Sequence, residues 1–172
     1  MYTTGETGAT TPTPPRGELV RRDPGLGMLA AQLLFAVQDE LYRRLGEAGY
    51  RDLRPRHGLV LAYLDQRGSR ATELAALSGR HKQRIGRTVD ELEALGYVRR
   101  DPDPADRRAK LVVPTARGRA VMRRSDQIMA DLGARAAAAV GADAYHQFRH
   151  TLHQLIHELR EARPTGPGQQ PR

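Results

Sequence analysis

The most constraining feature of this sequence is the order of segments between residues 73 and 113. A short apolar segment, Glu73 to Leu77, precedes a Ser78-Gly79 turn, and a longer segment, about His81 to Leu95, follows with apolar residues every three or four positions. Two β-prone runs then flank a loop rich in Pro and Asp. This order predicts two helices joined by a tight turn and followed by a β-hairpin.

The second of these helices is basic in its first half. Residues 80–88 carry four cations and no acid, whereas residues 89–93 carry three acids. The cations are Arg80, Lys82, Arg84 and Arg87. This is the pattern of a helix-turn-helix, whose second helix enters the major groove of DNA. The alternative is an ordinary pair of helices packed within a core.

The helical period indicates which side chains would face a groove floor. With Ile85, Val89 and Leu92 inward, a rotation of about 100° per residue places Gln83 and Arg87 near the opposite pole. Because Gln can bond an adenine edge and Arg a guanine edge, we expect these two residues to face bases. The remaining three cations lie toward the flanks, where they would reach phosphates.

The hairpin carries the more specific pattern. The run ELAALSGRHKQRIGRTVDELEALGYVRRDPDPADRRAKLVVPTARG contains Asp-x-Arg-x3-Leu/Val-x-Leu-Thr-x2-Gly on Asp106, Arg108, Val112, Thr115 and Gly118. It resembles the winged helix-turn-helix repressors of the MarR family, and the resemblance covers about residues 26–161. It implies that Arg108 enters the minor groove, with Arg107 as a second cation, and that Asp106 orients the wing. The alternative is a solvated turn with an internal ion pair.

Two residues depart from the pattern of that family. Pro114 stands where Leu is usual, and a proline cannot donate to a strand ladder, so the second wing strand is expected to fray there. His81 replaces the usual Thr or Ser N-cap, which predicts a less sharp helix start or an imidazole on a phosphate. Neither departure contradicts the fold.

The whole chain predicts a mainly α fold with a small β-hairpin wing. A first helix runs from Leu26 to about Gly46, a second begins at Pro55 and stops at Arg67-Gly68-Ser69, and Thr72 caps the third. We predict one domain over residues 21–162, with a winged helix-turn-helix lobe at 54–115 and dimerisation helices at 24–49 and 116–162. Residues 1–20 and 163–172, rich in Thr, Pro and Gly, read as disordered tails.

Composition limits the classes of partner. A net charge of +8 favours a polyanion, and only eight aromatic residues argue against proteins that stack single-stranded bases. The sequence lacks cysteine, a stretch of about 20 apolar residues and a secretory signal, so we expect a cytoplasmic protein with no membrane partner. We expect no cofactor, and no enzyme, since no nucleophile elbow or phosphate-binding loop is present.

The family resemblance also implies a homodimer and a small aromatic or phenolic effector. An apolar stripe in the last helix suits a dimer contact, although it could instead cover the core of its own chain. The stripe comprises Tyr145, Phe148, Leu152, Leu155, Ile156 and Leu159. The residues predicted to line an effector pocket are Leu33, Val37, Arg56, His57 and Leu61.

Four histidines, at positions 146, 150, 153 and 157, share another face of the last helix. Pairs four residues apart can chelate a transition metal, but ligands on one helix do not converge tetrahedrally. A solvated face is therefore the preferred interpretation, with a pH-sensitive dimer contact or a metal site as alternatives.

Together these features predict a dimeric, sequence-specific regulator, most simply a repressor, that binds a pseudo-palindromic duplex. A non-specific architectural DNA-binding protein is the alternative, because basic charge alone would suffice for it.

Overall fold

The computed structural model describes residues 24–161, apart from the side chain of Arg107. The predicted tails lie outside the described residues. The chain divides after Glu40 into two compact units. The first contains the start of helix α2 (Leu26–Glu47), and the second contains the rest of α2 and all later elements. That residues 21–162 form a single domain stays a prediction.

Two helices in the second unit form the predicted helix-turn-helix. They are α4 (Ala71–Ser78) and α5 (Lys82–Ala94). Gly79 ends α4 in the left-handed conformation, with φ 64°, which a residue with a side chain rarely adopts. Leu74 on α4 and Ile85 and Val89 on α5 are fully buried, so the apolar period that predicted these helices also packs them together.

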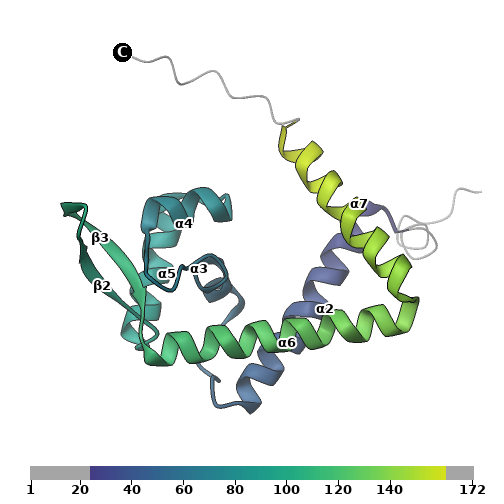
Figure 1. Cartoon of the computed structure of the whole chain (residues 1–172), viewed down its shortest axis with the longest axis horizontal. Coiled ribbons are helices and arrows are strands. Elements are labelled where there is room, and N and C mark those ends of the chain that lie inside the picture. Colours follow the sequence, from purple (N-terminus) through teal and green to yellow (C-terminus); the bar gives the residue numbers. More distant parts are fainter. Residues whose placement is uncertain (1–23, 162–172) are drawn as a thin grey trace, which may run out of the picture. The chain divides into compact units, whose positions relative to one another are not determined.

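The wing belongs to a small antiparallel sheet (Figure 1). Strands β1 (Ser69–Arg70), β2 (Val98–Asp103) and β3 (Asp106–Pro114) lie in the order β1-β3-β2. The hairpin strands are longer than predicted, because a two-residue turn at Pro104-Ala105 lets most of the polar loop join the ladder. Strand β1 was not predicted, since two residues are too few to show an alternating pattern.

Three local expectations are wrong. The second predicted helix is a 3-10 turn (Pro55–His57) followed by α3 (Gly58–Leu61), and it ends well before Arg67. The N-cap of α4 is Arg70 rather than Thr72, because β1 leads directly into the helix. Pro114 does not fray β3: it is buried opposite Val98, and the next residue's N–H donates to the Tyr97 carbonyl.

Two long helices complete the chain, α6 (Ala116–Val140) and α7 (Ala142–Glu161). The Thr115 hydroxyl caps α6 by accepting the Gly118 N–H. No residue of α7 is buried within the described chain. None of the helices between residues 24 and 161 is long and apolar enough to cross a bilayer. The predicted mainly α fold with a β-hairpin wing is confirmed.

Candidate nucleic-acid interface

One side of α5 is exposed and polar. The side chains of Lys82, Gln83, Arg84 and Arg87 are exposed, and Arg80 is exposed in the turn just before the helix. The opposite side of α5 is buried through Ile85, Thr88, Val89 and Leu92. The geometry therefore presents Gln83 and Arg87 away from the core, while their contact with bases stays a prediction. His81 is the N-cap of α5 and makes no side-chain capping bond, so its imidazole is available at this end.

The acids in the second half of α5 are held by cations from other elements. Arg100 on β2 pairs with Asp90, with Nη2 2.5 Å from Oδ1, and also with Glu93. Arg56 Nε lies 2.5 Å from Glu91 Oε2. By contrast, within residues 24–161 no acid pairs with Arg80, Lys82, Arg84 or Arg87. The N-terminal half of α5 therefore keeps its positive charge for an external anion.

A buried histidine fixes α5 against the 3-10 turn. His57 is 1% exposed, and its Nε2 lies 2.9 Å from Glu91 Oε2. Its Nδ1 accepts the Arg54 N–H at 3.1 Å, so Nε2 carries the proton and donates to Glu91. Hydrogen bonds from Arg56 and then His57 lower the pKa of Glu91. Sequence reasoning missed this contact, since the partners are 34 residues apart.

The wing tip is shaped by its own aspartates. Asp103 and Asp106 pair across the Pro104-Ala105 turn, whereas Pro102 pairs with Lys110, so β3 bulges over residues 107–109. The exposed Asp106 accepts the Arg108 N–H at 3.0 Å. Bulges of this kind re-aim side chains at a strand edge. Arg108, whose side chain is exposed, therefore lies on a re-aimed segment at the end of the wing.

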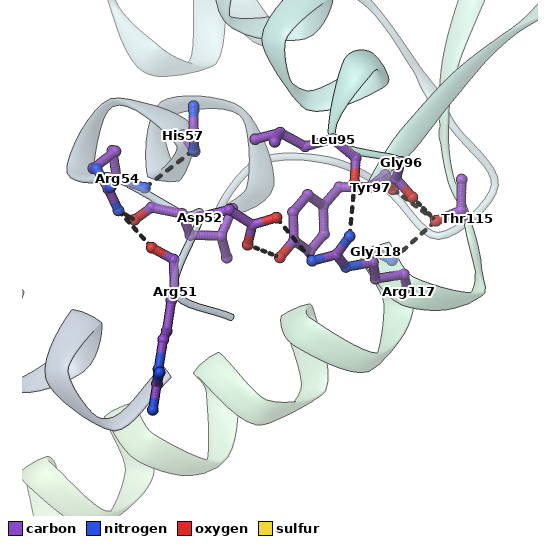
Figure 2. A network of polar contacts seen from close by, with 11 residues as sticks. Arg51, Asp52, Arg54, His57, Leu95, Gly96, Tyr97, Thr115, Arg117 and Gly118 are labelled. Carbon is purple, nitrogen blue, oxygen red and sulfur yellow. Dashed lines mark hydrogen bonds and ion pairs between the residues drawn. The ribbon is translucent and has the colours of Figure 1, made fainter. Parts of the chain in front are cut away.

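The base of the wing is joined to α6 by a polar network around Tyr97 (Figure 2). The buried Tyr97 hydroxyl donates to Asp52 Oδ1 at 2.6 Å, and Arg117 Nη2 lies 2.8 Å from Asp52 Oδ2. Arg117 also covers the Tyr97 ring, 4.3 Å from its centroid. Burial raises the pKa of Asp52, but the hydrogen bonds from Tyr97 and Arg117 outweigh it, so the pKa is lowered overall.

Gly118 allows the close approach of α6 to this network. A Cβ at this position would lie 2.0 Å from the Tyr97 carbonyl oxygen, which is too close for any side chain. The Thr115 hydroxyl donates to the Gly96 carbonyl at 2.7 Å beside it. The Thr-x2-Gly part of the sequence pattern therefore has a structural role at this junction.

The residues predicted for an effector pocket lie in different parts of the chain. Leu33 and Val37 are on α2 in the first unit, and Arg56, His57 and Leu61 are in the second. Arg56 is exposed, whereas both ring nitrogens of His57 already have partners. The pocket stays a prediction.

The four histidines of α7 are exposed, and His157 Nδ1 lies 3.5 Å from Glu161. In the described part of the chain, no group of three or more His, Asp or Glu side chains could hold a metal ion. The choice between a solvated face and a pH-sensitive contact stays a prediction.

The fold, with α5 cations that have no acidic partner within residues 24–161, is that of a winged helix-turn-helix protein of the DNA-binding class. Residues 51–109 match the sequence profile of the MarR family. No curated protein matches the chain. Its solved neighbours include regulators of the MarR family, and the chain is similar to that family over its winged helix-turn-helix segment.

Three solved structures illustrate the likeness. CouR from Rhodococcus jostii RHA1, bound to p-coumaroyl-CoA, is 28% identical, with 77% of this chain and 92% of that chain covered and a TM-score of 0.63. The repressor CouR bound to a 23-mer DNA duplex is 24% identical, with 84% and 99% covered and a TM-score of 0.66. A MarR-family protein of Mycobacterium tuberculosis in complex with salicylic acid is 26% identical, with 78% and 98% covered and a TM-score of 0.57.

Proposed function

We propose that this protein is a sequence-specific transcriptional repressor that binds double-stranded DNA as a homodimer. The observation that carries the proposal is the charge separation along α5. Its acids are neutralised by Arg56 and Arg100, whereas its N-terminal cations have no acidic partner within residues 24–161. A helix with an exposed, cationic N-terminal half beside a hairpin wing suits entry into a major groove.

Each cation has a proposed role. Gln83 and Arg87 read base edges, because they lie opposite the buried face of α5. Arg80, Lys82 and Arg84 bind phosphates and position the helix. Arg108 enters the minor groove, Arg107 is a second cation at the tip, and Asp106 orients the wing through its bond to the Arg108 N–H.

The homodimer is supported by the apolar stripe of α7. Phe148, Leu155, Ile156 and Leu159 are between 38% and 62% exposed in the single chain, whereas Tyr145 and Leu152 are half-buried. The stripe therefore does not serve only the core of its own chain, and a second copy would cover it. A two-fold dimer would bind half-sites about 34–36 Å apart, in a pseudo-palindromic operator.

A small effector completes the proposal. Two of the solved neighbours hold p-coumaroyl-CoA and salicylic acid, both of which contain an aromatic ring. We propose that an aromatic or phenolic compound binds this protein and releases the DNA.

Competition binding tests the proposal. A labelled duplex selected from random sequence is challenged with unrelated DNA, first with the native protein and then with Arg87→Ala. The native protein should keep its site, and Arg87→Ala should bind about 5- to 150-fold more weakly, which corresponds to roughly 1–3 kcal/mol, with relaxed preference at one position per half-site. Arg160→Ala, which removes an exposed cation from α7, is the matched control and should leave sequence preference unchanged. Equal competition by unrelated DNA would instead indicate a non-specific architectural protein, which a net charge of +8 would also allow.

A further inference from the structure

A buried carboxylate lies at the tip of the wing. The Asp103 side chain is only 7% exposed, although the tip is surrounded by solvent-facing residues. Its Oδ2 accepts from Arg70, at 2.7 Å from Nε and 2.5 Å from Nη2. Its Oδ1 accepts the Ala105 N–H at 2.8 Å. Both carboxylate oxygens are therefore engaged, one by the turn itself and one by another strand.

Arg70 connects this carboxylate to the helix-turn-helix. It is the second residue of β1 and the N-cap of α4. Its N–H donates to Glu73 Oε2 at 2.9 Å, which closes the first turn of α4. Its guanidinium, at the same time, donates from both Nε and Nη2 to the same oxygen, Asp103 Oδ2, in a charge-assisted contact that holds the two side chains together.

Asp103 and Asp106 have different surroundings, although they pair across the same turn. Asp106 is exposed and accepts a hydrogen bond from the N–H of Arg108 on its own strand. It can shape the tip locally. Asp103 reaches outside the hairpin, and a bond from the Ala105 N–H followed by one from Arg70 holds its pKa below the ordinary range. Asp103 therefore stays ionised and bound to Arg70 at neutral pH.

We propose that Arg70 and Asp103 are positioning residues that set where the wing tip lies relative to the helix-turn-helix. Their ion pair joins the turn that precedes Arg108 to the residue that starts α4. The inference rests on the proposed function, because it assigns the pair a role in how the wing meets DNA. It predicts that the pair controls how much the flanking minor groove adds to affinity, while α5 alone controls preference within the half-site.

The test compares two affinity ratios in the same set of variants. The flank ratio is the affinity for an operator with A/T-rich flanks divided by that for the same operator with G/C-rich flanks, since a narrow A/T groove attracts an inserted arginine. The half-site ratio compares the intact operator with one carrying a half-site mismatch. Asp103→Asn and Arg70→Lys should lower the flank ratio by about 2- to 30-fold, the usual range for a residue that acts through another. The half-site ratio should not change.

Two comparisons show whether the effect runs through Arg108. Arg108→Ala alone should lower the flank ratio, and adding it to Asp103→Asn should lower it little further, because both changes would remove the same contact. The matched control is Arg99→Gln, which breaks a neighbouring ion pair with Asp101 on β2, where Nη2 lies 2.7 Å from Oδ2. In that control pair Arg99 is exposed and Asp101 is partly exposed, and the flank ratio should stay unchanged.

A second readout does not need DNA. Hydrogen exchange of the Ala105 amide should be faster in Arg70→Lys than in the native protein, because the carboxylate that accepts this N–H would no longer be held. Arg70→Lys also keeps the charge and the main-chain cap, so it serves if Asp103→Asn does not fold.

The outcomes separate the two proposals. An unchanged flank ratio in folded Arg70→Lys, with the half-site ratio intact, would overturn the positioning role and leave the regulator standing. If the native protein shows no preference between the intact operator and the mismatched one, the proposed function is refuted instead. In that case an unchanged Ala105 exchange rate in Arg70→Lys would overturn the positioning role as well, and a faster rate would support it.

Discussion

Removing the Tyr97 hydroxyl should destabilise the protein without changing its packing. In Tyr97→Phe the ring keeps its fully buried place, but Asp52 Oδ1 loses a donor at 2.6 Å. Hydrogen bonds to a charged acceptor contribute about 1.5–3 kcal/mol. Because the Asp52 side chain is 31% exposed, water can replace part of that bond, and we expect a loss of about 1.5–2 kcal/mol.

The assay is thermal and urea unfolding at fixed protein concentration, since a dimer would make the midpoint depend on concentration. For a chain of this size, 1 kcal/mol shifts the melting temperature by roughly 2–4 °C, so Tyr97→Phe should melt about 3–8 °C lower. Tyr63→Phe is the control, because Tyr63 is 42% exposed and its hydroxyl makes no hydrogen bond within residues 24–161. It should lie within about 0.5 kcal/mol of the native protein.

The partner of the lost bond can be checked by a double-mutant cycle with Asp52→Ala, which removes the acceptor. Arg117 Nη2 keeps its contact with the other Asp52 oxygen in Tyr97→Phe, so the cycle isolates the hydroxyl. A coupling energy below about 0.5 kcal/mol, or equal losses in Tyr97→Phe and Tyr63→Phe, would refute the role assigned to this network.

Three further predictions follow from the same structure. Gly118→Ala should cost about 1–3 kcal/mol or more by urea unfolding, because its Cβ would meet the Tyr97 carbonyl, whereas Gly86→Ala on α5 has open space and should gain about 0.5–1 kcal/mol. Lys82→Ala should weaken binding to all duplexes about evenly, and a salt titration should show a slope smaller by about 1; a change in site preference would argue against a phosphate contact. The pKa values of Asp52, Glu91 and Asp103 are all lowered in the folded chain, so the unfolded state takes up protons first as the pH falls. The free energy of unfolding should be steady above about pH 5 and decrease below about pH 4, and a decrease that begins near pH 7 would contradict this.

The helices were predictable because their signals are local. Ile85, Val89 and Leu92 recur at intervals of three and four residues within one segment. Gly79 marks the end of α4, at the residue where a left-handed conformation is required. The predicted start of the C-terminal helical region at residue 116 likewise coincides with the start of α6. Local periodicity and turn chemistry therefore account for the order of elements.

The contacts that fix the candidate interface were not predictable in the same way. His57 with Glu91, Tyr97 with Asp52, and Arg70 with Asp103 join residues 33 to 45 positions apart. Each pairing depends on how separate segments of the chain come together in the fold. Asp103 in particular is, in the sequence, one more acid of a polar loop, and its burial and its contact with Arg70 are evident only in the folded chain.

The central claim, that the chain reads a specific duplex through α5, is tested most directly by sequencing the genomic fragments that the purified native protein retains. The account predicts one enriched pseudo-palindrome whose half-sites lie about one helical turn apart, and loss of preference at one position in each half-site when the selection is repeated with Arg87→Ala. Retention of fragments with no shared motif, or an identical motif from the native protein and Arg87→Ala, would contradict it.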